Sequence, residues 1–141
     1  MLGDRMNKRM KKGLLIFGSV AGLLVMIVAS GLIWISRGLD TLETIEFSQT
    51  SFEVLEDGVY EGRCDEGRWT TTVELTVEEG SIESITLIDD VTFREEGVFE
   101  DVKAQVIASM SLDIDAVSGA TLTSNAYLTA IEDALMAARN E

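Results

Sequence analysis

The sequence predicts an α+β fold, in which a small antiparallel sheet packs with two helices and is preceded by one N-terminal transmembrane helix. Three observations predict it: an uncharged apolar run over 13–36, an alternating segment over 69–78 with a returning β-branched segment over 82–88, and helical periodicity after residue 100. A chain of 141 residues has room for one ordinary domain once the apolar run is subtracted. The predicted segments are a basic N-terminus (1–12), a transmembrane helix (13–36), a stalk (37–56) and a folded domain (57–141).

The apolar run extends from Gly13 to Ser36 without a charged residue. As a helix rising about 1.5 Å per residue it exceeds the roughly 30 Å hydrocarbon core of a bilayer. A cleaved signal peptide is the alternative, because 28–30 resembles a cleavage site, but the run continues through Trp34 and Ile35. We therefore expect an uncleaved, single-pass anchor.

Charge is divided unevenly along the chain. Residues 1–12 carry a net charge of +4, and the remainder carries −18. Basic residues directly before the apolar run predict a cytoplasmic N-terminus, so the C-terminal domain is expected outside the cytoplasm, at the cell membrane. A domain this acidic would repel phosphate backbones, which argues against nucleic acid as a partner.

Histidine is absent, and cysteine occurs once, at Cys64. Zinc sites built on histidine, ordinary histidine-ligated haem and an intramolecular disulfide are therefore excluded. We expect Cys64 to be an unreactive thiol and assign it no role. The acid pairs 78–79, 89–90 and 95–96 lack the order of a calcium loop, so we expect them to be solvated surface and predict no metal site.

The strands are predicted from turn residues and alternation. The domain is expected to begin at the Asp57–Gly58 turn, with a short strand over 59–62. Alternation over 69–78 and a returning β-branched segment over 82–88 predict an antiparallel hairpin. We interpret Trp69 and Tyr60 as core residues. The expected buried side of the longer strand comprises Trp69, Thr71, Val73, Leu75 and Val77.

Two amphipathic helices are expected after the hairpin. The first covers 101–110, and the second covers about 124–138 with Ser124 as its N-cap. The residues expected to face the core are Val102, Val106, Met110, Tyr127, Ile131 and Leu135.

The loop between these helices, 112–123, holds the candidate site. Gly119 lets backbone approach a ligand, while Ser118, Thr121 and Thr123 offer hydroxyl groups. Together with the free N–H groups at the start of the following helix, these residues could form a phosphate-binding site. Such a loop is ordinarily only a helix cap, so spacing alone leaves the ligand open.

The sequence DAVSGAT, from Asp115 to Thr121, matches every defined position of a D-x-x-[ST]-G-A-T motif. It resembles the site at which flavin transferases attach FMN in the FMN-binding domain family. DGVYEG over 57–62 is similar to the opening of that domain, and 73–85 is similar to its hairpin, whereas 89–100 shows no family motif. The family includes subunits of the sodium-translocating NADH:quinone oxidoreductase and extracellular electron-transfer flavoproteins.

This resemblance implies a covalent cofactor. FMN would be joined to the Thr121 oxygen as a phosphoester, transferred from FAD by a separate magnesium-dependent flavin transferase outside the cytoplasm. Asp115, Ser118, Gly119 and Ala120 would be recognised by that enzyme, and Thr123 completes the expected cofactor-binding set.

The resemblance further implies an electron carrier beside a membrane dehydrogenase or another quinone-linked redox partner. The flavin would perform the redox chemistry, so we assign no catalytic residue and no independent substrate turnover. Two alternatives stay open: a noncovalent flavin-binding, sensory or assembly module, and a structural domain without flavin.

Overall fold

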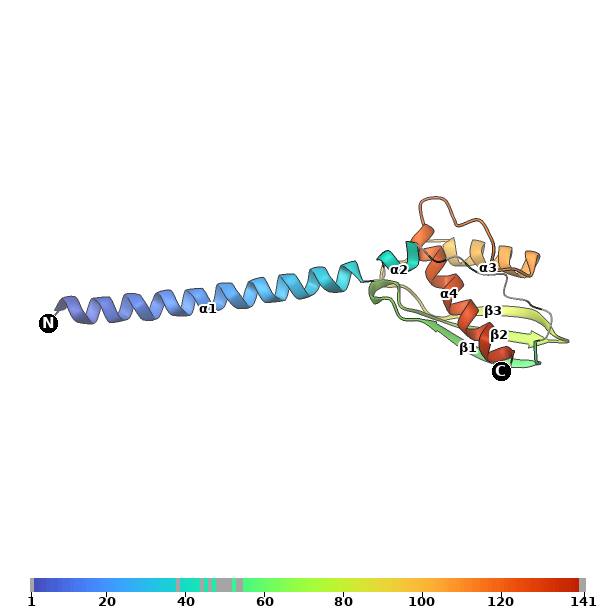
Figure 1. The fold of residues 1–141 in the computed structure, drawn as a ribbon, viewed down its shortest axis with the longest axis horizontal. Coiled ribbons are helices and arrows are strands. Elements are labelled where there is room, and N and C mark those ends of the chain that lie inside the picture. Colours follow the sequence, from blue (N-terminus) through green and yellow to red (C-terminus); the bar gives the residue numbers. More distant parts are fainter. Residues whose placement is uncertain are drawn as a thin grey trace. The chain divides into compact units, whose positions relative to one another are not determined.

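The computed structural model describes residues 2–37, 39–43, 45, 47, 52 and 55–139. The chain divides into two compact units, Met1–Ser36 and Arg37–Glu141. Helix α1 (Leu2–Ser36) forms the first unit. The second contains, in order, α2 (Leu39–Glu43), β1 (Gly58–Cys64), a 3-10 turn η1 (Gly67–Trp69), β2 (Thr71–Glu78), β3 (Ser81–Asp89), α3 (Val98–Ser109) and α4 (Thr121–Ala138) (Figure 1).

Helix α1 is long and apolar enough to cross a membrane, judged by length and composition. The candidate membrane span lies within Ile16–Glu43, and no residue of its most apolar stretch is buried against the rest of the described protein. The hydroxyls of Ser19 and Ser30 donate to the carbonyls of Ile16 and Ile27, so these polar groups are satisfied within the helix. Internal satisfaction of this kind is what a hydrocarbon environment requires.

The sheet has three antiparallel strands in the order β1-β2-β3, which confirms the predicted hairpin. Leu75 in β2 lies opposite Ile85 in β3, and both side chains are fully buried. The hairpin turn uses Glu79 and Gly80, both with positive φ. All five residues predicted for the buried side of the longer strand are buried.

The long strand nevertheless begins later than predicted. Trp69 ends the 3-10 turn η1 and does not belong to β2, which starts at Thr71. Gly67 adopts a left-handed φ of 59°, which turns the chain before the extended segment can begin. On the opposite side of β2, which was expected to face solvent, Thr72 is buried.

Helices α3 and α4 cover the same face of the sheet (Figure 1). Helix α4 packs across β1 and β2, while α3 packs against β3 and α4. The predicted core-facing residues of α4 are fully buried, as are Val102 and Val106 of α3. Met110 is only partly buried, since it follows α3 in a left-handed conformation with a φ of 48°.

Close packing of α4 on β1 depends on Gly62. A Cβ added there would lie 2.1 Å from the Ala130 carbonyl oxygen and 2.3 Å from the Ala134 backbone nitrogen. These small residues let the helix and strand backbones approach each other directly. Gly62 therefore sets the distance between α4 and the sheet, and with it the position of the start of α4.

Both helices begin three residues earlier than predicted. Helix α3 starts at Val98 and α4 at Thr121, so the prediction of Ser124 as N-cap was wrong. Ala120 occupies the N-cap position, and the Ser124 hydroxyl, inside the helix, accepts a 3.2 Å hydrogen bond from the Val117 N–H. The hydroxyl thus anchors the preceding loop and does not cap the helix.

The predicted stalk falls partly outside the described residues. Within this segment the structure has one short helix among the described residues, α2 at 39–43. Its Leu42 is fully buried in the domain core, and Asn125 Nδ2 of α4 donates a 2.6 Å hydrogen bond to the Leu42 carbonyl. Leu55 is buried in the same core. These parts of 37–56 pack onto the domain.

Candidate cofactor site

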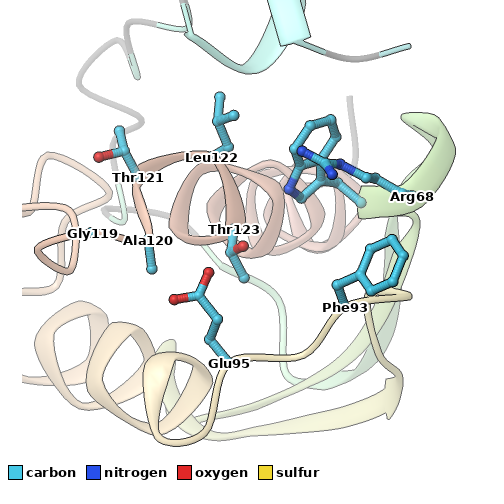
Figure 2. A pocket seen from close by; sticks show the side chains of 9 residues that line it. Arg68, Phe93, Glu95, Gly119, Ala120, Thr121, Leu122 and Thr123 are labelled. Carbon is cyan, nitrogen blue, oxygen red and sulfur yellow. The ribbon is translucent and has the colours of Figure 1, made fainter. Parts of the chain in front are cut away.

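A cavity of about 360 Å³ opens beside the start of α4. Three chain segments meet there: the 3-10 turn η1, the loop after β3 and the first turn of α4 with the two residues before it (Figure 2). We call residues 90–97, between β3 and α3, the cavity loop. The cavity is lined by Arg68, Trp69, Phe93, Glu95, Gly119, Ala120, Thr121, Leu122 and Thr123.

Thr121 is the first residue of α4, and its side chain is exposed at the cavity. Because Ala120 at the N-cap has no polar side chain, no side-chain hydrogen bond caps this helix start. N–H groups in the first turn have no acceptor within the helix, and the helix dipole places positive charge there. A phosphate linked to the Thr121 hydroxyl would thus meet free donors.

The motif residues before α4 separate into two groups. Gly119 and Ala120 line the cavity, as does the buried Thr123 within the helix. Asp115 and Ser118 are exposed and lie outside the lining. Gly119 adopts a left-handed φ of 86°, a conformation that favours glycine, and this turn delivers the chain into α4.

Arg68 of η1 and Phe93 of the cavity loop line the part of the cavity away from Thr121 (Figure 2). The guanidinium carbon of Arg68 lies 4.0 Å from the centroid of the Trp69 ring and 6.0 Å from that of Phe93. Trp69 is buried, as predicted for a core residue, and it also lines the cavity. Arg68 therefore rests on an aromatic surface at the site.

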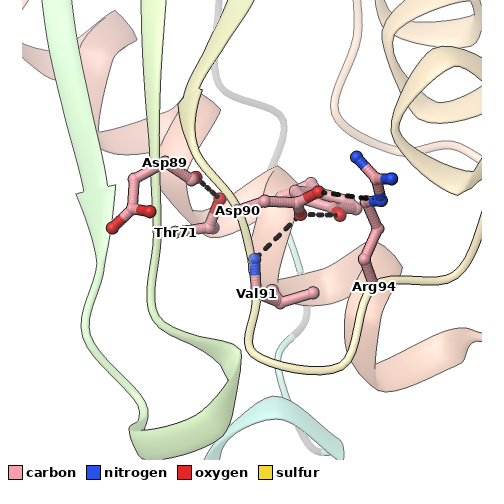
Figure 3. A network of polar contacts seen from close by, with 6 residues as sticks. Thr71, Asp89, Asp90, Val91 and Arg94 are labelled. Atoms are coloured by element: carbon pink, nitrogen blue, oxygen red, sulfur yellow. Dashed lines mark hydrogen bonds and ion pairs between the residues drawn. The ribbon is translucent and has the colours of Figure 1, made fainter.

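Hydrogen bonds hold the cavity loop in place. The Thr92 N–H donates to the Arg68 carbonyl at 2.9 Å, which joins the loop to η1. At the start of the loop, Asp90 Oδ1 accepts from the Val91 N–H at 2.8 Å and from the Tyr127 hydroxyl at 2.5 Å (Figure 3). The loop is thus fixed both to the 3-10 turn and to α4.

Asp90 corrects the expectation that every acid pair is solvated surface. Its side chain is 22% exposed, and Arg94 lies 3.8 Å from Oδ2, an ion-pair distance too long for a hydrogen bond. Burial, followed by the hydrogen bond to the Asp90 carboxylate, raises the pKa of Tyr127 well above its usual value. Tyr127 therefore remains a neutral donor to this carboxylate.

Sequence patterns missed half of this site. The lining residues that were not predicted as site residues are Arg68, Trp69, Phe93, Glu95 and Leu122, and the segment 89–100 carried no recognisable motif. One signal was present: Arg68 is among few basic residues of a strongly acidic domain and stands beside a tryptophan. Only the fold shows that it shares a cavity with Thr121.

The lining residues fit a flavin mononucleotide. The volume lies within the range of roughly 300–1,000 Å³ typical of small-molecule sites. Free N–H groups at the start of α4 suit a phosphate, while Trp69, Phe93 and Leu122 offer apolar surface to a ring system. Arg68 adds a cation whose Nε is buried without a hydrogen-bond acceptor among the described residues.

Comparison with known families agrees with this chemistry. Residues 67–136 match the family model of the FMN-binding domain. This segment is similar to an FMN-binding domain. The match includes η1, β2, β3, α3 and nearly all of α4, and it therefore contains every residue that lines the cavity. This similarity supports FMN as the cofactor of the cavity.

The chain is also similar to a curated protein. An uncharacterized protein of Treponema pallidum (strain Nichols) is 34% identical over 84 residues, which cover 57% of this chain and 23% of that protein. The chain thus spans less than a quarter of the length of this relative. Because the similarity covers only part of the relative, it does not indicate the activity of either whole protein.

Proposed function

We propose that this protein is a membrane-anchored, extracytoplasmic flavoprotein that carries FMN in a phosphoester bond to Thr121 and serves as an electron carrier. The observation that supports it most directly is the position of Thr121. Its exposed side chain lies on the first turn of α4, at the edge of a cavity in the segment that is similar to an FMN-binding domain. The residue also ends a complete D-x-x-[ST]-G-A-T motif.

Attachment from FAD would form a bond between Thr121 Oγ1 and the phosphorus of the FMN half. The pyrophosphate bond of FAD breaks, AMP leaves, and the hydroxyl proton is released. A separate flavin transferase would perform this step, reading Asp115 and Ser118. Exposure of both residues outside the cavity lining supports a role in recognition by another protein.

The proposed carrier role follows from tethering. A flavin linked to Thr121 cannot diffuse away, so it can accept electrons from a membrane dehydrogenase or quinol and pass them to an acceptor outside. Helix α1, which could cross a membrane, would keep the domain beside its donor. The basic N-terminal residues support the extracytoplasmic placement.

Intact mass of the full chain tests the covalent bond. The protein would be co-expressed with a flavin transferase, purified in detergent and compared with Thr121→Val. We expect a gain equal to FMN less one water, lost in Thr121→Val. Thr129→Val is the matched control, since it removes a hydroxyl from the same helix outside the cavity lining and should keep the gain. A Thr121→Val protein that retained the flavin mass would refute the assignment.

Noncovalent binding is the second candidate, because the cavity includes Arg68, Phe93 and Glu95 whether or not a bond forms at Thr121. Unfolding in denaturant followed by dialysis distinguishes the two. A covalent carrier keeps its yellow colour on the unfolded chain, whereas a noncovalent module loses it.

A further inference from the structure

Arg68 lines the cavity without an ion pair among the described residues, unlike three other basic residues of the domain. Arg63 lies 3.9 Å from Asp65, Arg94 lies 3.8 Å from Asp90, and Lys103 lies 3.5 Å from Glu100. Within the described part of the chain, no carboxylate oxygen lies at ion-pair distance from Arg68. In so acidic a domain, an arginine without an acid beside it calls for another explanation.

The Arg68 side chain is also held at a cost. Its Nε is buried and has no hydrogen-bond acceptor among the described residues. An unsatisfied buried donor costs about 1–3 kcal/mol, and more when the group is charged. The cation–π contact with Trp69, in which the guanidinium carbon lies 4.0 Å from the ring centroid, offsets part of this cost. The side chain is thus positioned for an acceptor that the protein itself does not supply.

The cavity provides the place for that acceptor. Thr121 lies at one end of the row of lining residues, and Arg68 with Phe93 lies at the other (Figure 2). A cofactor fixed by its phosphate at Thr121 would extend its ring system along the cavity. The free donors of Arg68 would then meet the polar edge of that ring and not the phosphate.

We propose that Arg68 contacts the flavin ring and stabilises its reduced, negatively charged form, raising the reduction potential against the acidic background of the domain. The inference rests on the proposed function. Reduction adds two electrons, supplied in the test by dithionite, and one proton at N5, so the ring gains one negative charge, spread over N1 and O2. A partly buried cation stabilises this charge more than exposed residues can, because solvent screens it less.

Glu95 defines the opposing contribution. Its carboxylate belongs to the same cavity, on the cavity loop, and its negative charge disfavours the reduced ring. The two residues should therefore shift the potential in opposite directions: loss of Arg68 lowers it and loss of Glu95 raises it. A purely structural role for Arg68 predicts no such opposition.

The test measures the midpoint potential of the full-length flavinylated protein in detergent, by dithionite titration with a reference dye. Arg68→Gln removes the charge, and Arg68→Met keeps an unbranched chain over Trp69 in case the first variant folds poorly. Arg63→Gln is the matched control, because it removes the same charge from β1, away from the cavity. Both Arg68 variants should lower the reduced-to-oxidised ratio about tenfold at a fixed potential, a shift of about 30 mV for two electrons. Glu95→Gln should move it upwards.

Intact mass separates failure of this inference from failure of the covalent proposal. If all variants carry covalent FMN and the Arg68 variants share the potential of Arg63→Gln, the inference is wrong and the attachment stands. If the parent protein carries no covalent flavin, each apoprotein is titrated with free FMN by calorimetry. Binding at least tenfold weaker in the Arg68 variants than in Arg63→Gln then supports the contact, and equal binding overturns it.

Discussion

The Tyr127 hydroxyl donates a 2.5 Å hydrogen bond to Asp90 Oδ1 and so joins the middle of α4 to the first residue of the cavity loop. Because α4 carries Thr121 and the cavity loop carries Phe93 and Glu95, this bond links the two halves of the site. It connects residues 37 positions apart in sequence. The shape of the cavity and the stability of the core are therefore coupled through this partly buried polar contact.

Tyr127→Phe should lower the free energy of unfolding by about 1–3 kcal/mol, because the substitution leaves the partly buried Asp90 carboxylate without its hydroxyl donor. Thermal or denaturant unfolding of the full chain in detergent, followed by circular dichroism, measures the change. Tyr60→Phe is the control, since its hydroxyl donates at an exposed position to the Glu56 carbonyl, and it should stay within about 0.5 kcal/mol of the parent. Equal losses of unfolding free energy in the two variants would show that the Tyr127–Asp90 hydrogen bond contributes no more to stability than the exposed one.

Gly62→Ala should destabilise the domain by about 3 kcal/mol or more, because the new Cβ collides with the backbone of α4 at Ala130 and Ala134. Gly97→Ala provides the comparison. It introduces a side chain at a φ of 86° but into open space, so only backbone strain of about 1–2 kcal/mol is expected. Unfolding midpoints of the two variants give the order, and a milder effect at Gly62 than at Gly97 would disprove the close approach of β1 and α4.

Alkaline pH should weaken the domain through Cys64. Burial, followed by the nearby negative charges of Glu66 and Asp65, raises the pKa of this thiol from 9.0 to about 11. The unfolded chain ionises above pH 9 while the folded chain stays neutral, so stability present below pH 9 is lost as pH rises towards 11. The slope approaches about 1.4 kcal/mol per pH unit.

The Cys64→Ala variant isolates this contribution. It lacks the thiol, so its unfolding free energy should fall less steeply between pH 9 and pH 10 than that of the parent. Above pH 10, Tyr127, whose pKa is also raised, lowers stability in both proteins. Parallel profiles of parent and variant from pH 8 to pH 10 would contradict the assignment.

Asp115→Asn should slow attachment of FMN at least tenfold without changing the unfolding midpoint. Asp115 is exposed and lies outside the cavity lining, so its expected role is recognition by the transferase and not retention of the flavin. Intact mass at successive times of incubation with FAD and transferase measures the rate. Asp113→Asn, an exposed acid two residues earlier on the same loop, should react as fast as the parent. Equal rates for all three proteins would remove Asp115 from the recognised motif.

Local patterns predicted the elements well where one residue pattern implied one structure. Alternation in 69–78 identified the buried side of β2, and the spacing of Tyr127, Ile131 and Leu135 identified the buried stripe of α4. The helix starts were less predictable. Serine is a common N-cap residue, but the turn at Gly119 starts the helix before Ser124. The Ser124 hydroxyl therefore accepts a hydrogen bond from the Val117 N–H from within the helix.

The sequence by itself determined the apolar N-terminal helix, the antiparallel hairpin, the two helices and Thr121 as the candidate attachment residue, because each depends on residues close together in the chain. Only the tertiary structure decided what faces Thr121. Arg68, Phe93 and Glu95 reach the cavity from η1 and the cavity loop, which are brought to α4 by sheet pairing, by the Gly62 contact and by the Asp90–Tyr127 bond. The physical reason is that a cavity is lined by residues distant in sequence, and backbone geometry across the whole domain sets which of them meet.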